Sequence, residues 1–204
     1  MLLGILGIVI GYLLGAIPSA YIMASLRKGV DVRKFGVGNI RAMNVFRHIG
    51  IWEGIVVGVA DVAKGAVAIL IAQALGVSEF WWLGSGFTAL LGHNFPVFLG
   101  FKGGKGSATA IGIFLLLVPK EMGLALGIMA LTILVTRNLV FALGIGFALV
   151  PLFIWLFSES AVLIFYSLAI IGLIGLTSLL TVRKIGLKRS TSSGTLTKAD
   201  GKLT

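Results

Sequence analysis

Seven runs of apolar residues, separated by short polar segments, make up most of the chain. They cover residues 2–25, 54–76, 81–99, 108–118, 122–135, 139–157 and 161–181. A helix rises about 1.5 Å per residue, so the first run alone would be about 36 Å long, enough to cross a hydrocarbon core of about 30 Å. The pattern therefore predicts an all-α fold, a polytopic membrane helix bundle.

The number of spans depends on the segment Pro119-Lys120-Glu121, which separates two short apolar runs. As a turn between two helices it gives seven spans, and inside one long helix it gives six. With seven, 15 of the 17 Lys and Arg residues fall on one side of the membrane. Cytoplasmic loops carry an excess of these residues. We therefore predict seven transmembrane helices, with the N-terminus outside and the C-terminus in the cytoplasm.

The composition agrees with a membrane protein, because 58% of the residues are hydrophobic and only 12% are charged. No linker interrupts the apolar pattern, which predicts one membrane domain (1–189) followed by a polar, disordered tail (190–204). The net charge of +10 sits beside the apolar runs. It indicates membrane lipids and anionic substrates as partners, and no nucleic acid. With no Cys and two His, we expect neither a metal site nor a cofactor.

The segment from Gly100 to Ser107, Gly-Phe-Lys-Gly-Gly-Lys-Gly-Ser, is the first candidate site; we call it the glycine loop. Its glycines let N–H groups converge on one point. A helix is expected to begin near Ser107, which would cap it, and a helix N-terminus favours anions. Lys102 and Lys105 add positive charge. These residues are equally consistent with a phosphate site and with a basic loop that contacts lipid headgroups.

Three other polar segments interrupt the apolar pattern. His93 and Asn94 lie just before the glycine loop; they can serve a site or hydrogen-bond between helices, and His93 can act as a base near neutral pH. Residues 36–47 offer amides, glycines and guanidinium groups suited to phosphate, Arg47 among them. Asp61 and Lys64 share one helical face, which indicates a structural ion pair rather than a catalytic one.

No nucleophile suited to an acyl-enzyme is evident, since the chain contains neither Cys nor a Gly-x-Ser-x-Gly segment. Direct transfer, with catalysis by positioning and electrostatics, is therefore the more plausible chemistry.

At these residues the chain resembles the bacterial acyl-phosphate:glycerol-3-phosphate acyltransferases of the PlsY type. The likeness runs from residue 11 to about 183 and includes the Asp61-x-x-Lys64-Gly65 segment. It is most specific over the fifteen residues from Gly92 to Gly106, Gly-His-Asn-Phe-Pro-Val-Phe-Leu-Gly-Phe-Lys-Gly-Gly-Lys-Gly.

The resemblance implies a seven-helix enzyme of the bacterial inner membrane with its active site at the cytoplasmic face. It would move a fatty acyl group from acyl phosphate to the sn-1 hydroxyl of glycerol 3-phosphate, giving lysophosphatidic acid for phospholipid biosynthesis. The substrate's own phosphate could take the hydroxyl proton. The catalytic residues implied are His93, Lys105 and Arg47. The substrate-binding residues are Gly38, Asn39, Asn44, Lys102, Gly103, Gly104, Gly106 and Arg137.

The chain departs from the family pattern at several positions. Val37, Arg41 and Met43 replace Ser, Gly and Thr in the first motif, and Lys184 takes the place of Asn in the last one. The family has a polar residue, often Ser, shortly after its Thr-Arg pair; here Thr136-Arg137 is followed by Asn138, Leu139 and Val140. Two alternatives stay open: a diverged protein that uses another acceptor or only binds lipid or anion, and a small transporter whose path is lined by Asp61, Lys64 and His93.

Overall fold

The computed structural model describes residues 1–31, 33, 42–158 and 160–200, with side chains as far as residue 182. In this part of the chain the elements are all helical, as predicted. They are α1 (Leu2–Ala16), α2 (Ser19–Lys28), α3 (Ala42–His48), α4 (Ile51–Ala74), α5 (Glu79–Asn94), the 3₁₀ helix η2 (Val97–Leu99), α6 (Ser107–Leu117), α7 (Pro119–Thr136), α8 (Leu139–Phe157) and α9 (Ala161–Asp200).

Five helical segments in the described residues are long and apolar enough to cross a membrane. They are residues 2–28, which combine α1 and α2, then α4, α7, α8 and residues 161–182 of α9. Helix α6 is apolar but has only 11 residues, and α5 has 16. Each of the seven predicted apolar runs thus contains a helix, and five of the seven have the length of a full span.

Two breaks interrupt the apolar pattern. Pro18 separates α1 from α2, since it has no N–H to donate to the preceding turn. The second break lies at Val118, between α6 and α7, where the backbone leaves the helical region (φ −139°, ψ 64°). Two helices are present here, as the seven-span interpretation requires. The turn was expected at Pro119-Lys120-Glu121, but Pro119 instead begins α7, because proline suits the first turn of a helix.

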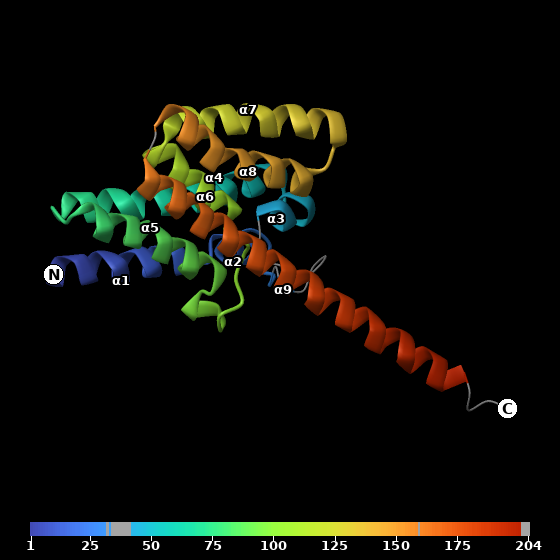
Figure 1. Ribbon diagram of the computed structural model, residues 1–204. Helices are drawn as coiled ribbons and strands as arrows, with labels where there is room; N and C mark the ends of the chain where they lie inside the picture. Colours follow the sequence, from blue (N-terminus) through green and yellow to red (C-terminus); the bar gives the residue numbers. More distant parts are fainter. Residues whose placement is uncertain (32, 34–41, 159, 201–204) are drawn as a thin grey trace.

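Helix α4 lies at the centre of the bundle and packs against α1, α3, α5 and α6. Helix α1 lies alongside α5, α7 alongside α8, and α9 crosses against α8 and α5 before it extends beyond the other helices (Figure 1). Small residues permit the closest approaches. A Cβ on Gly15 would collide with the Ala89 carbonyl of α5, and one on Gly112 with the Val62 carbonyl of α4. Such contacts are typical of membrane helices.

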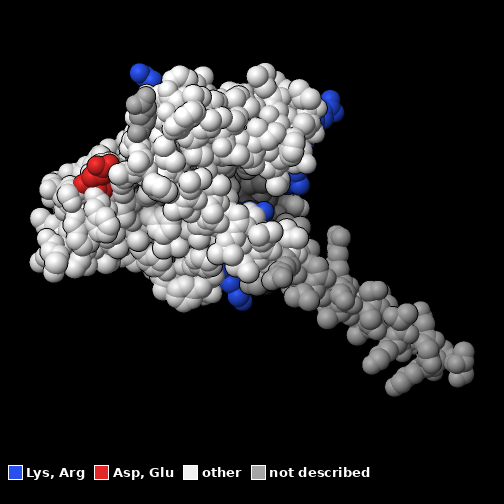
Figure 2. Space-filling model, in the orientation of Figure 1, with Lys and Arg blue, Asp and Glu red and all other residues white. Residues whose placement is uncertain are grey.

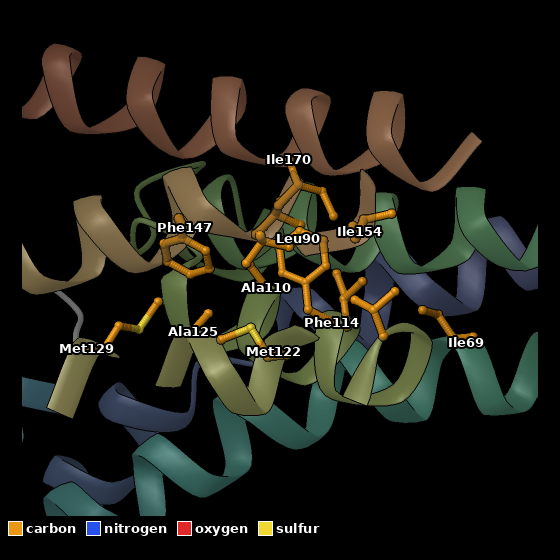
Figure 3. Close-up of a cluster of buried hydrophobic side chains, with 13 residues drawn as sticks. Ile69, Leu90, Ala110, Phe114, Met122, Ala125, Met129, Phe147, Ile154 and Ile170 are labelled. Atoms are coloured by element: carbon orange, nitrogen blue, oxygen red, sulfur yellow. The ribbon is translucent and has the colours of Figure 1, made fainter. Parts of the chain in front are cut away.

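The main core cluster joins α4, α5, α6, α7, α8 and α9 (Figure 3). Its largest members are fully buried: Phe114, Ile69, Leu90, Ile113, Met122, Ile154 and Ile170. Phe114 of α6 meets Phe147 of α8, with ring centroids 6.3 Å apart. This cluster holds α6 between α4 and α8, and so sets where the N-terminus of α6 lies.

Large apolar side chains cover the outside of the bundle as well. Trp52, Phe80, Phe141, Trp155 and Phe165 are each more than half exposed. The face in Figure 2 is mostly free of charged side chains and is hollowed at one place, where a Lys or Arg side chain lies at the edge. An apolar exterior of this kind is expected where lipid is the solvent. The backbone of residues 190–200 continues α9, and the tail as a separate disordered segment stays a prediction.

Candidate active site

The glycine loop connects the end of α5 to the start of α6 and binds to the end of α5. The last carbonyls of a helix have no partners inside it. Here the Gly104 N–H donates to the His93 carbonyl (3.0 Å) and the Gly103 N–H to the Asn94 carbonyl (3.2 Å). The Tyr12 hydroxyl of α1 donates to the Phe95 carbonyl (2.9 Å). These bonds hold the loop against His93 in a defined position.

The glycines of the loop are required by close contact. A Cβ on Gly104 would collide with Nε2 of His93, and one on Gly103 with the His93 carbonyl oxygen. Gly106 has a left-handed backbone (φ 81°) and precedes the first residue of α6. It is therefore the N-cap, and the prediction that Ser107 caps the helix is wrong. Ser107 lies one residue later, inside the helix, because glycine takes the left-handed position most easily.

The first turn of α6 provides the groups that suit an anion. The N–H groups of Gly103 and Gly104 donate to carbonyls of α5. They therefore fix the position of the loop and do not bind the anion. The N–H groups at Ser107, Ala108 and Thr109 have no acceptor within the helix. The helix dipole places partial positive charge at the same point.

A cluster of buried charged groups lies beside the loop. The Lys64 ammonium donates to Oδ1 of Asp61 (2.7 Å) and to the Ile17 carbonyl at the break between α1 and α2 (2.6 Å). Oδ1 of Asp61 is also 3.8 Å from Nδ1 of His93. The Lys64 and Asp61 side chains are only 7% and 5% exposed. The predicted ion pair is therefore present, and its carboxylate also faces His93.

The cluster and the loop open into a cavity of about 510 Å³. Its polar end is formed by Asp61, His93, Lys105, Gly106 and Ser107. Its remaining walls are mostly apolar side chains of α6, α8 and α9. They include Ile111, Leu139, Val140, Leu143, Phe147, Ile171 and Ile174. The cavity thus combines a polar end, which includes Lys105 and the N-terminus of α6, with walls that are mostly apolar.

The sequence profile of the family described as glycerol-3-phosphate acyltransferase matches residues 5–185. The chain belongs to this family. Glycerol-3-phosphate acyltransferase 4 of Dehalococcoides mccartyi is 39% identical over 180 residues, which cover 88% of this chain and 97% of that protein. The glycerol-3-phosphate acyltransferase of Geotalea daltonii is 40% identical over 163 residues, or 80% of this chain and 84% of that protein.

Two solved structures have the same fold. A crystal structure of PlsY (YgiH), an integral membrane glycerol 3-phosphate acyltransferase, in its glycerol 3-phosphate form has a TM-score of 0.81 and 31% identity. The match covers 91% of this chain and 93% of that one. The lysophosphatidic acid form has a TM-score of 0.79, 30% identity and the same coverage. The family resemblance is confirmed, and it favours the acyltransferase over the transporter and the non-catalytic alternative.

The structure brings together some of the predicted family site residues. His93, Lys105 and Gly106 line the large cavity, and Gly103 and Gly104 lie against His93. Asn44 is buried in α3. Arg47, Lys102 and Arg137 are exposed, and none is among the described residues that line the cavity. Gly38 and Asn39 lie outside the described residues. The roles assigned to all of these residues stay predictions.

Sequence reasoning assigned no substrate-site role to two residues that line the cavity, Asp61 and Ser107. It interpreted Asp61 as half of a structural ion pair and Ser107 as a helix cap; the charged residue inside an apolar run was the available signal for Asp61. One departure from the family pattern, Met43, also lines the cavity, as does Val140, the third residue after Arg137. Asn94 is 3% exposed, and its side-chain amide has no hydrogen-bond partner among the described residues. The remaining departures, Val37, Arg41 and the side chain of Lys184, lie outside the described part.

Proposed function

We propose that this chain transfers a fatty acyl group from acyl phosphate to the sn-1 hydroxyl of glycerol 3-phosphate, giving lysophosphatidic acid. The observation that carries the proposal is the cavity. One end of it holds Lys105 and the N-terminus of α6, which suit a phosphate, and its other walls are mostly apolar. An acyl phosphate has the matching form, a dianionic head on a long hydrocarbon chain. The names of the relatives and the glycerol 3-phosphate form of PlsY support the choice of acceptor.

In this proposal the donor phosphate binds at the start of α6. The first-turn amides and the helix dipole attract it, and Lys105 supplies a full positive charge beside them. The acyl chain lies along the groove between α6, α8 and α9. Its carbonyl carbon is then held near the polar end, where His93 and Lys105 face the cavity.

The reaction needs no covalent intermediate on the protein. The acceptor hydroxyl oxygen attacks the acyl carbonyl carbon, an ester C–O bond forms, and the C–O bond to phosphate breaks. The hydroxyl proton passes to the departing phosphate, which leaves as hydrogen phosphate. Negative charge grows on the carbonyl oxygen and on the leaving group, and Lys105 with the N-terminus of α6 stabilises it. Binding of both substrates in one cavity lowers the activation barrier further, because the reacting groups are already close and oriented.

We further propose seven membrane-inserted helices in the bacterial inner membrane, with the N-terminus outside and the C-terminus and active site at the cytoplasmic face. The end of α2 lies beside α3 and the start of α4, because Lys28 donates to the His48 carbonyl and Arg27 pairs with Glu53. The cavity joins the starts of α6 and α8 to residues 171–178, the later part of the apolar span of α9 (residues 161–182). These ends share one side only if the helices alternate in direction.

A different acceptor is the second candidate, and one observation favours it. Met43, which stands where the family has Thr, lines the cavity, and Val140 adds to its apolar wall. An apolar wall removes hydrogen bonds worth about 1 kcal/mol each to a polyol. Assays with glycerol 3-phosphate and with acceptors that have fewer hydroxyl groups separate the two candidates.

Removal of the Lys105 ammonium tests the proposed function. Purified protein in detergent is given palmitoyl phosphate and glycerol 3-phosphate, and lysophosphatidic acid and released phosphate are followed. Lys105→Ala should lower kcat/KM about 10²-fold or more, because the charge acts on the transition state. The matched control is Lys120→Ala at the exposed start of α7, which should retain full activity. Glycerol 3-phosphate-independent turnover, or no turnover in folded wild type, would refute the proposal.

A further inference from the structure

We propose that Lys64 is a positioning residue of the active site. Through Asp61 it holds the His93 ring, and with it the glycine loop, in the position that binds the donor phosphate. This inference goes beyond an ion pair that only joins helices. It rests on the proposed function for its kinetic readout, while its structural readout is independent of any reaction.

Lys64 connects two separate parts of the chain, α4 and the break between α1 and α2. Its ammonium donates to Oδ1 of Asp61, one turn earlier on α4, and to the Ile17 carbonyl. Ile17 lies at the break between α1 and α2, where Pro18 interrupts the helix. The ammonium therefore fixes α4 to the α1–α2 break at a single point and fixes the direction of the Asp61 carboxylate.

The carboxylate faces His93 at ion-pair distance, which is longer than a hydrogen bond. The oxygen that accepts from Lys64 is also the one that lies 3.8 Å from Nδ1 of His93. The opposite edge of the ring, at Nε2, lies against the Gly104 backbone so closely that a Cβ there would collide with it. The His93 carbonyl accepts from the Gly104 N–H as well. A shift of Lys64 or Asp61 would therefore move His93 and the loop that carries Lys105.

Stability alone does not account for this arrangement. A buried ion pair gives little net stability, because desolvation of both charges offsets their attraction, and apolar residues of similar size often do as well. Here Asp61 and His93 line the large cavity. Lys64, Asp61 and His93 also line a small adjoining cavity of about 10 Å³, beside Gly103 and Gly104.

Comparison of a single and a double variant separates positioning from folding. Lys64→Met leaves Asp61 buried without its cation, so it should lower both the melting temperature and turnover. Asp61→Asn/Lys64→Met removes both charges and nearly keeps the shape, so it should recover the melting temperature. Its kcat should nevertheless stay about 10- to 100-fold below wild type. The KM for glycerol 3-phosphate should change less than kcat, because the acceptor is not held by these residues.

The structural readout is hydrogen exchange at the Gly103 and Gly104 amides, measured by mass spectrometry in detergent. Their N–H groups donate to α5 carbonyls, so exchange should become faster in the double variant. Ser85→Ala is the matched control. It removes a buried hydroxyl that joins α5 to the Gly7 and Ala68 carbonyls, and should lower the melting temperature without changing kcat or exchange in the loop.

The outcomes distinguish this inference from the proposed function. Wild-type kcat and unchanged loop exchange in the folded double variant would overturn the positioning role. Faster loop exchange in that variant, with no acyl transfer by wild type, would support positioning and refute the proposed function. If neither variant folds, Lys64→Arg replaces them, since it keeps the charge in a different shape. Reduced kcat with faster loop exchange in folded Lys64→Arg supports the role, and wild-type values for both contradict it.

Discussion

Individual residues of the glycine loop serve its position against α5 more than direct anion binding. The N–H groups of Gly103 and Gly104 donate to carbonyls at the end of α5, so they are not available to an anion. The loop lies so close to the His93 ring that a side chain at position 104 does not fit. This leaves the first turn of α6 and Lys105 as the groups of the loop region that can attract an anion at the cavity.

A single methyl group at position 104 tests this interpretation. Gly104→Ala should push the His93 ring or the loop by about 1 Å, which can cost about 10²-fold in kcat/KM. Gly123→Ala is the control, because a Cβ at this exposed position of α7 meets nothing within 4 Å. Turnover with palmitoyl phosphate measures the difference. Equal kcat/KM in the two variants would contradict the close contact between the loop and His93.

At the scale of elements, α6, α8 and α9 together decide the size of the apolar groove. Gly144 of α8 and Gly175 of α9 both line the cavity, and a Cβ on either would meet nothing within 4 Å. Both glycines are exposed, so the cavity is open beside α8 and α9 at these positions. We interpret this opening as room for the acyl chain.

Larger side chains at these positions should shorten the acyl chain that the protein accepts. In Gly144→Leu or Gly175→Leu, kcat/KM for palmitoyl phosphate should fall about tenfold or more relative to that for decanoyl phosphate, since each buried CH₂ contributes about 0.8 kcal/mol. The fold should persist, because leucine favours helix more than glycine does. Gly127→Leu on the exposed face of α7 controls for bulk alone. An unchanged chain-length profile would place the acyl chain elsewhere.

At the scale of the whole molecule, the proposed topology brings the cavity to the cytoplasmic side. Helix ends around the cavity carry exposed cations, among them Arg27, Lys28, Lys102 and Arg137. The opposite end has a buried Glu121 that accepts from the Ser158 hydroxyl. This asymmetry agrees with the excess of cations on the cytoplasmic side of membrane proteins.

The absence of cysteine from the sequence makes this topology simple to test. In intact cells, a membrane-impermeant thiol reagent should label Lys120→Cys at the start of α7. It should label Lys102→Cys in the glycine loop only after the membrane is opened. A melting temperature close to that of wild type shows that each variant is folded. The reverse labelling pattern would invert the orientation.

The sequence by itself determined the features that depend on local order. Runs of apolar residues predict membrane helices because each backbone must satisfy its own hydrogen bonds in lipid, and a helix is present in every predicted run. The separation of α6 from α7 and the glycine loop before α6 could also be predicted, because Pro and Gly act on their immediate neighbours. The segment from Gly92 to Gly106 was specific enough to indicate the family.

Only the tertiary structure decided which distant residues meet. Asp61 and His93 are 32 positions apart and belong to different helices, and their contact depends on how α4 and α5 pack. The groove likewise exists because α8 and α9 leave space beside α6 at Gly144 and Gly175. Helix periodicity shows which residues share a face, but several faces of a membrane helix are equally apolar. The choice among them is made by close packing at residues such as Gly15 and Gly112.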